Sequence, residues 1–206
     1  MNKLNIVDWA KELYALAETG LFFTKDVFDK ERFERIKQIS FEMLAQVAEE
    51  PVDKIAELYL EEKGYQTPKV DTRAIVWRGD KLLLVQENDG LWALPGGWMD
   101  VTQTISSNIR KEVFEEAGME VEVGRLVAIH DRNIHNPGLN PFTILKIFVE
   151  CQYVSGMFRP NSETIASEFF AEDEIPPLME RKTSTEQVRL AFEAKKQGEK
   201  WQPLFD

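Results

Sequence analysis

The sequence predicts an α/β domain with a mixed β-sheet, preceded by a small all-α segment. Three observations support this prediction. Apolar residues recur at helical spacing in the first part of the chain, strand-like runs follow Pro68, and two further helical stretches interrupt those runs. Strands and helices mixed in this order favour a sheet that is covered by helices on both faces. We therefore divide the chain into a helical segment at 1–66 and a sheet domain at 67–206.

The helical segment contains three predicted helices. The first ends at Gly20, the second follows Asp29, and the third begins near Pro51, a residue that suits the first turn of a helix. Acidic residues outnumber basic ones here, so the segment is not a basic nucleic-acid-binding module. An amphipathic cap or a dimer arm is the favoured interpretation. The apolar stripe of the first helix consists of Ile6, Trp9, Leu13 and Leu16.

The sheet domain begins with a predicted hairpin. Strand-like runs at 70–77 and 81–86 flank the pair Gly79-Asp80, which is typical of a tight turn. The remaining expected elements are a helix at 104–117 that stops at Gly118, strands at 121–129 and 141–153, and a last helix at 184–197.

Composition and charge exclude several classes of protein. Hydrophobic residues make up 43% of the 206 residues, and no apolar run approaches the roughly 18 residues of a membrane span. The formal net charge of −11 opposes broad binding to a nucleic-acid backbone. Cys151 is the only cysteine, so no intrachain disulfide can form and a reducing cytoplasm is the expected location.

Three glutamates mark the helix that carries the chemistry. Glu112, Glu115 and Glu116 stand at i, i+3 and i+4, so their side chains project from one side within one turn. Like charges this close destabilise an isolated helix, whereas a hard divalent cation binds such oxygens. A solvated acidic face has the same spacing. The preceding loop, Leu94-Pro95-Gly96-Gly97, favours the metal site, because its backbone can approach a phosphate or offer a carbonyl to a metal.

This stretch resembles the Nudix box, which runs Gly, five residues, Glu, seven residues, then Arg-Glu-aliphatic-any-Glu-Glu-any-Gly-aliphatic. Two positions depart from that pattern: Gln103 replaces the family's first Glu, and Lys111 replaces its Arg. In the family these two groups brace the loop–helix–loop, and Lys111 keeps the positive charge without the bidentate fork of arginine. The matching positions are Gly97, Glu112, Val113, Glu115, Glu116, Gly118 and Met119.

The wider sequence resembles a bacterial Nudix branch that acts on X-linked nucleoside diphosphates such as ADP-ribose or CDP-choline. The stretches WAKELYALAETGLFFTKDVFDKERFERIK, VDTRAIVW and LPGGWMDV carry this resemblance. It implies an α/β/α sandwich with a mixed sheet, a homodimer, and cleavage of a small nucleotide into a nucleoside monophosphate and a phosphorylated X. Mg²⁺ or Mn²⁺ would be the cofactor. A nucleoside triphosphate sanitising enzyme, a weak or inactive nucleotide sensor and an RNA-end-processing enzyme are also compatible with these residues.

The resemblance also implies roles for individual residues. A base must take a proton from the attacking water, and family members use either a box glutamate or a later loop. Glu112 is therefore one candidate for the catalytic base, and Glu163 or Glu168 is the other. The implied metal ligands are Glu112, Glu115, Glu116 and Gly97.

Several residues outside the box are candidates for substrate binding. Arg73 and Lys146 each interrupt an apolar strand, where they either hold substrate phosphates or form an internal salt bridge. His135 and Arg132 lie in the polar loop HDRNIHNPGLN, which either faces the substrate or is a plain connection; its two histidines do not indicate a transition-metal site. Trp92 and Trp98 flank the loop of residues 94–97, called the glycine loop from here on. Each of these tryptophans either stacks on a base or packs in a core.

Overall fold

The computed structural model describes residues 3–60, 62–138, 140 and 142–206. The chain forms two compact units, one of Met1–Pro68 with Leu139–Thr143 and the other of Lys69–Gly138 with Ile144–Asp206. None of the described helices is both long and apolar enough to cross a membrane.

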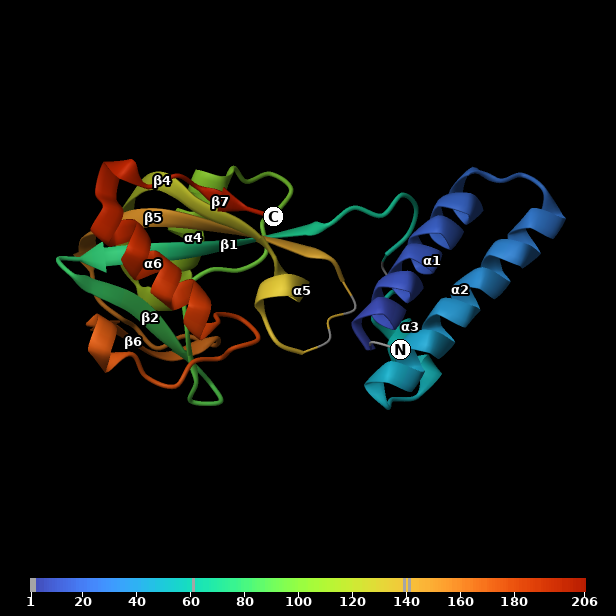
Figure 1. Ribbon diagram of the computed structural model, residues 1–206, viewed down its shortest axis with the longest axis horizontal. Coiled ribbons are helices and arrows are strands. Elements are labelled where there is room, and N and C mark those ends of the chain that lie inside the picture. Colours follow the sequence, from blue (N-terminus) through green and yellow to red (C-terminus); the bar gives the residue numbers. More distant parts are fainter. Residues whose placement is uncertain (1–2, 61, 139, 141) are drawn as a thin grey trace. The chain divides into compact units, whose positions relative to one another are not determined.

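The first unit is a helical hairpin followed by a short helix (Figure 1): α1 spans Lys3–Phe23, α2 spans Val27–Ala48 and α3 spans Val52–Glu57. α2 begins earlier than expected because Asp26 caps it, its Oδ1 accepting the N–H groups of Phe28 and Asp29 at 2.9 Å each. The core of this unit consists of Val7, Ala10, Tyr14, Phe41, Leu44, Ala45, Ile55 and Tyr59.

α1 differs from the prediction in its end and in its buried face. It passes through Gly20, where a β-carbon would lie 2.4 Å from the ring of Phe33, so this glycine allows α2 to approach rather than ending α1. The predicted stripe is not the core face, since Trp9 is 47% exposed and Leu16 is 58% exposed. The buried row of α1 is Val7, Ala10, Tyr14 and Ala17. α1 therefore has two apolar faces, and one of them packs within its own unit.

The second unit is built on a seven-stranded mixed sheet of order β3-β2-β1-β5-β4-β7, with β6 paired to β2. β1 runs parallel to β5, whereas β2 and β6, and β4 and β5, are antiparallel. The prediction missed the strands β3, β6 and β7. The strands are β1 Lys69–Arg78, β2 Lys81–Glu87, β3 Trp92–Ala93, β4 Met119–Asp131, β5 Ile144–Gly156, β6 Thr164–Phe170 and β7 Leu204–Phe205.

Two helices cover opposite faces of this sheet (Figure 1): α4 spans Ile105–Ala117 and α6 spans Thr185–Gln197. α4 agrees with its predicted bounds, because Thr104 caps its start and Gly118 ends it in the left-handed conformation at φ 67°. The arrangement confirms the predicted α/β fold with an all-α segment before it. The shorter helical turns are α5 Arg132–His135, η1 Glu172–Glu174 and η2 Gly198–Lys200.

The glycine loop takes the edge of β1 that β2 leaves free. β1 pairs with β2 only over its last two residues. Further back along β1, the N–H of Thr72 donates to the carbonyl of Gly97 at 2.9 Å, and the N–H of Ala74 donates to that of Pro95 at 2.8 Å. Gly96 makes this approach feasible, since its φ is +143° and a β-carbon there would lie 1.9 Å from the Thr72 oxygen. The loop is thereby held rigidly against the sheet.

Candidate active site

The glycine loop and α4 bring two buried carboxylates against backbone. Glu116 accepts the N–H of Gly96 through Oε2 at 2.8 Å. The Oε2 atom of Glu112 lies 2.8 Å from the point where a β-carbon on Gly97 would stand. Glu112 is 8% exposed and Glu116 is 5% exposed. The two glycines therefore have different roles: Gly96 lets the loop reach β1, and Gly97 leaves room for a carboxylate.

Burial makes both carboxyl groups weaker acids. It raises the pKa of Glu116 to about 7, against the opposing effects of Arg73 and the Gly96 N–H. Burial also raises the pKa of Glu112, which the positive charge of Lys111 opposes. A cation close to these two buried carboxyl groups would stabilise their charged forms.

Lys111 lies beside the glutamate cluster, which consists of Glu112, Glu115 and Glu116. Its Nζ lies 2.9 Å from Oδ2 of Asp100, and 3.7 Å from one carboxylate oxygen each of Glu112 and Glu115. Two of these three partners, Glu112 and Glu115, are thus carboxylates on which the metal site would depend. Gln103 is half-buried, its N–H donates to the Asp100 carbonyl at 2.9 Å, and its side chain makes no hydrogen bond within the described residues.

The glutamate cluster has the donor types that suit a divalent metal, but its side chains are not arranged around an ion. Among the described residues, no group of three or more His, Cys, Asp or Glu side chains is arranged to hold an ion. Glu115 turns towards Lys111, while Glu112 and Glu116 face the glycine loop. The donors nevertheless suit a hard ion, because three carboxylates share one helical turn beside a loop that Gly97 keeps open. The carbonyl of Gly97 already accepts one hydrogen bond from β1.

Of the two later-loop glutamates, Glu163 is the one whose charge acts on Glu112. It is exposed, and its N–H donates to Oδ1 of Asn161 at 2.9 Å. Glu168 lies further along β6, exposed and opposite Leu84.

Arg73 and Lys146 lie in a buried ion cluster around Asp71. Arg73 donates to Oδ2 of Asp71 through Nε at 3.2 Å and Nη2 at 3.0 Å, and to the carbonyl of Leu94 through Nη1 at 3.1 Å. Lys146 Nζ lies 3.8 Å from the same Asp71 oxygen and donates to the carbonyl of Lys182. Burial lowers the pKa of Lys146 to about 7, with Arg73 adding to the effect. Both cations form internal ion pairs, and Arg73 also holds the first residue of the glycine loop.

The polar loop after β4 contains the short helix α5. Arg132 is buried there and donates to two carbonyls of its own loop. His135 Nε2 lies 2.9 Å from Oδ1 of Asp206, and its ring stacks on that of His130 with the centroids 3.8 Å apart. These contacts tie both candidates to the loop and to the segment that follows β7.

The two tryptophans beside the glycine loop have different surroundings. Trp92 is buried and packs edge-on against Phe170, with 4.9 Å between the ring centroids. Trp98 is 52% exposed.

Sequence reasoning overlooked Asp71 and Lys182. Asp71 stands two residues before Arg73, so the period of a strand places both on one face; this spacing is a signal that the sequence contains. Lys182 pairs with Glu87 at 2.5 Å from a distant segment of the chain, and no local pattern indicates it.

Comparison with known proteins identifies the family. Residues 67–191 match the NUDIX domain, and residues 5–59 match a UDP-X-like, N-terminal oligomerisation domain. The Bacillus subtilis (strain 168) protein YjhB, named as a candidate ADP-ribose pyrophosphatase, is 37% identical over 198 residues, which are 96% of this chain and 95% of that protein.

Two solved structures resemble this fold. An ADP-ribose pyrophosphatase from Streptococcus suis 89-1591 is 51% identical with a TM-score of 0.63, covering 68% of this chain and all (100%) of that one. A UDP-X diphosphatase is 35% identical with a TM-score of 0.62, covering 99% of this chain and 100% of that one. The glutamate cluster thus lies within a domain of known chemistry, and the chain belongs to the Nudix family as one of its pyrophosphohydrolases.

Proposed function

We propose that this enzyme hydrolyses the pyrophosphate bond of a nucleoside diphosphate linked to a further group, with ADP-ribose as the first candidate substrate. The products are a nucleoside monophosphate and a phosphorylated X. The observation that carries the proposal is the pair of buried carboxylates, Glu112 and Glu116, held against Gly96 and Gly97. The names of YjhB and of the Streptococcus suis protein favour ADP-ribose, whereas that of the UDP-X diphosphatase keeps other nucleotides, CDP-choline among them, as candidates.

The residues of the cluster would have different roles in hydrolysis. Glu112, Glu115 and Glu116 would hold Mg²⁺ or Mn²⁺, which neutralises the diphosphate and acidifies a bound water. Lys111 restrains two of these carboxylates, those of Glu112 and Glu115. Glu112 or Glu163 accepts the proton of the attacking water.

The decisive experiment compares the wild type with Glu116→Gln on ADP-ribose, CDP-choline, UDP-sugars, nucleoside triphosphates and 5′-triphosphorylated RNA, with Mg²⁺ and then Mn²⁺. We expect metal-dependent cleavage of a linked nucleoside diphosphate, and a loss of at least about 100-fold in the variant. Glu122→Gln, an exposed carboxylate on β4, is the matched control and retains the wild-type rate.

Each contrary outcome of this experiment has a definite meaning. Tight binding of a nucleotide without turnover would establish a sensor. A preference for nucleoside triphosphates would establish a sanitising enzyme, and a preference for RNA would establish an RNA-end-processing enzyme.

We also propose that the protein is a homodimer joined through α1. Trp9, Leu16 and Phe23 are spaced by seven residues, and they are 47%, 58% and 67% exposed. A heptad row of this kind on one helix is typical of a helix–helix interface. The match of residues 5–59 to an oligomerisation domain supports the same conclusion.

Leu16→Glu tests the dimer. We expect the wild type to have about twice the chain mass of 23.8 kDa in light scattering and the variant to have the monomer mass. Val154→Glu, which places the same charge at an exposed apolar position on β5, leaves the mass unchanged. A wild-type monomer would overturn the proposal.

A further inference from the structure

The last turn of α4 ends in carbonyl groups that helix geometry leaves without partners inside the helix. The carbonyl of Phe114 accepts the N–H of Gly118 at 2.9 Å, at the helix end itself. The carbonyls of Glu115 and Glu116 instead take their partners from residues 161–164, a segment that includes the first residue of β6. The turn that carries two of the metal-ligand candidates is thus held by a distant part of the chain.

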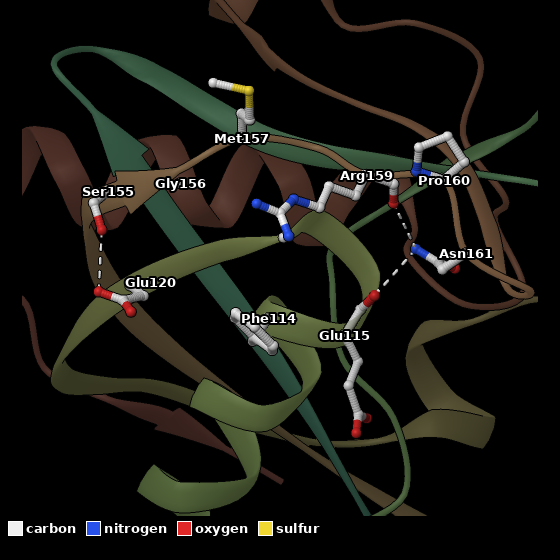
Figure 2. A pocket seen from close by; sticks show the side chains of 10 residues that line it. Phe114, Glu115, Glu120, Ser155, Gly156, Met157, Arg159, Pro160 and Asn161 are labelled. Atoms are coloured by element: carbon white, nitrogen blue, oxygen red, sulfur yellow. Dashed lines mark hydrogen bonds between the residues drawn. The ribbon is translucent and has the colours of Figure 1, made fainter.

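Asn161 makes the first of these contacts. Its Nδ2 donates to the carbonyl of Glu115 at 3.0 Å, beside the pocket that opens at this end of α4 (Figure 2). The same nitrogen donates to Oγ1 of Thr164 at 2.8 Å, and that hydroxyl donates to the carbonyl of Glu116 at 2.6 Å. Thr164 is only 1% exposed, so water has little access to its hydroxyl. One amide group therefore reaches both carbonyls, one directly and the other through a buried hydroxyl.

Asn161 also fixes the main chain of Glu163. Its Oδ1 accepts the N–H of Glu163 at 2.9 Å and that of Thr164 at 2.8 Å, which is a turn typical of asparagine. The peptide group between Ser162 and Glu163 is held on its other side as well, because Asn88 donates to the carbonyl of Ser162 at 3.2 Å. Both polar atoms of this peptide group thus bind side chains, although the segment is exposed. The main chain at Glu163 is therefore fixed in place.

The side chain of Glu163 is the group that this arrangement positions. It is exposed, and it has no hydrogen bond or ion pair within the described residues. Burial contributes most to the raised pKa of Glu112, and the negative charge of Glu163 adds to that effect, so the two carboxylates lie within electrostatic reach of each other. A carboxylate with free lone pairs near the glutamate cluster can accept a proton from a water molecule that is held there.

We propose that Asn161 is a positioning residue for hydrolysis, one that links the main chain of Glu163 to the turn of α4 carrying Glu115 and Glu116 and acts through the Glu163 carboxylate as the base. This inference rests on the proposed function. Without the Asn161 amide, the loop keeps Glu163 but loses its fixed place beside α4, and misplacing a reacting group by about 1 Å costs on the order of 100-fold in rate. A residue that only caps α4 would form the same hydrogen bonds, so stability and catalysis have to be separated.

A double-mutant cycle of Asn161→Ala and Glu163→Gln makes this separation under turnover of the preferred substrate. We expect Glu163→Gln to lower kcat about 100-fold, because a general base contributes on the order of 100-fold or more. Asn161→Ala alone should lower kcat about tenfold and change KM less than about threefold. In the Glu163→Gln background it should cost less than about twofold, since the misplaced group no longer acts. A residue that only stabilises α4 would lower the rate equally in both backgrounds.

Two further variants define which contacts matter. Asn161→Asp keeps an acceptor for the two N–H groups but turns a charged oxygen towards the Glu115 carbonyl, so its kcat should be as low as that of Asn161→Ala. Gln152→Ala is the matched control, because it removes a bond from another exposed side-chain amide to a distant carbonyl, that of Trp77 at 2.8 Å. It should retain the wild-type kcat.

Amide hydrogen exchange measures the positioning without substrate or metal. The N–H groups of Glu163 and Thr164 should exchange roughly tenfold more slowly in the wild type than in Asn161→Ala, and Asn161→Asp should keep most of this protection. Equal exchange in the wild type and Asn161→Ala, or an equal rate loss in both backgrounds of the cycle, overturns the proposal. Protection as expected in a protein that cleaves no substrate supports the fixed position of Glu163, and the proposed function alone then fails.

Discussion

The Oε2 atom of Glu112 lies 2.8 Å from the position that a β-carbon on Gly97 would occupy. Real β-carbons essentially never approach another heavy atom this closely, so a side chain at residue 97 must displace the carboxylate. Gly97 is not among the glycines with positive φ, which means that this site requires space rather than an unusual backbone conformation. The neighbouring Gly96 requires both.

Gly97→Ala should therefore lower kcat by about tenfold, because the carboxylate of Glu112 must move aside and a misplacement of a full ångström costs about 100-fold. The measurement is steady-state hydrolysis of the preferred substrate, with the thermal midpoint recorded to establish that the variant folds. A folded variant with the wild-type rate would show that the position of Glu112 does not matter for activity.

Lys111→Met should lower kcat about tenfold, because Glu112 and Glu115 lose the cation that restrains them. Removing a positive charge beside the carboxylates does not weaken their attraction for a metal, so the metal concentration at half-maximal rate should not rise. Lys111→Arg, which restores the family's residue, should match or exceed the wild type. Metal titrations of all three proteins give the comparison, and a large rise in the metal requirement of Lys111→Met would contradict this role.

Arg73→Met should reduce the free energy of unfolding by about 3–5 kcal/mol, since it leaves Asp71 buried without its main partner. The control is Arg181→Met, which breaks an exposed pair with Asp89 whose side chains are 68% and 46% exposed. That change should cost no more than about 1 kcal/mol. Urea unfolding measures both. Equal stability of the two variants would mean that the buried pair has no structural role.

The stability of the protein should depend on pH through His130. Burial lowers the pKa of His130 to about 4, with the charge of His135 contributing, whereas the unfolded side chain titrates near pH 6.5. Between about pH 4 and pH 6.5 the unfolded chain binds the extra proton, so the unfolding free energy attributable to His130 rises with pH by up to about 3 kcal/mol.

His130→Gln removes that contribution. Urea unfolding of the wild type and the variant at several pH values should give a stability difference that changes across this window and is constant above about pH 7. A difference that does not vary with pH would show that His130 titrates normally in the folded protein.

The sequence alone determined the elements whose signals are local. The helix α4 was predicted to begin at Thr104 and to stop at Gly118, because an N-cap hydroxyl and a C-terminal glycine act within one turn of the chain. The i, i+3, i+4 spacing of Glu112, Glu115 and Glu116 likewise depends only on helix geometry. The family followed from residues in the same short stretch.

Only the tertiary structure decided which row of apolar residues on α1 is buried and which partner the Arg73 side chain binds. The apolar residues of α1 form two rows, and only the approach of α2 at Gly20 buries the row containing Tyr14 rather than that of Trp9. Arg73 could have faced a phosphate, but β5 and the glycine loop enclose it with Asp71 and the Leu94 carbonyl. The bond from Asn161 to the Glu115 carbonyl likewise joins residues that lie 46 positions apart in the chain. Burial and pairing depend on segments distant in the chain, which local spacing does not encode.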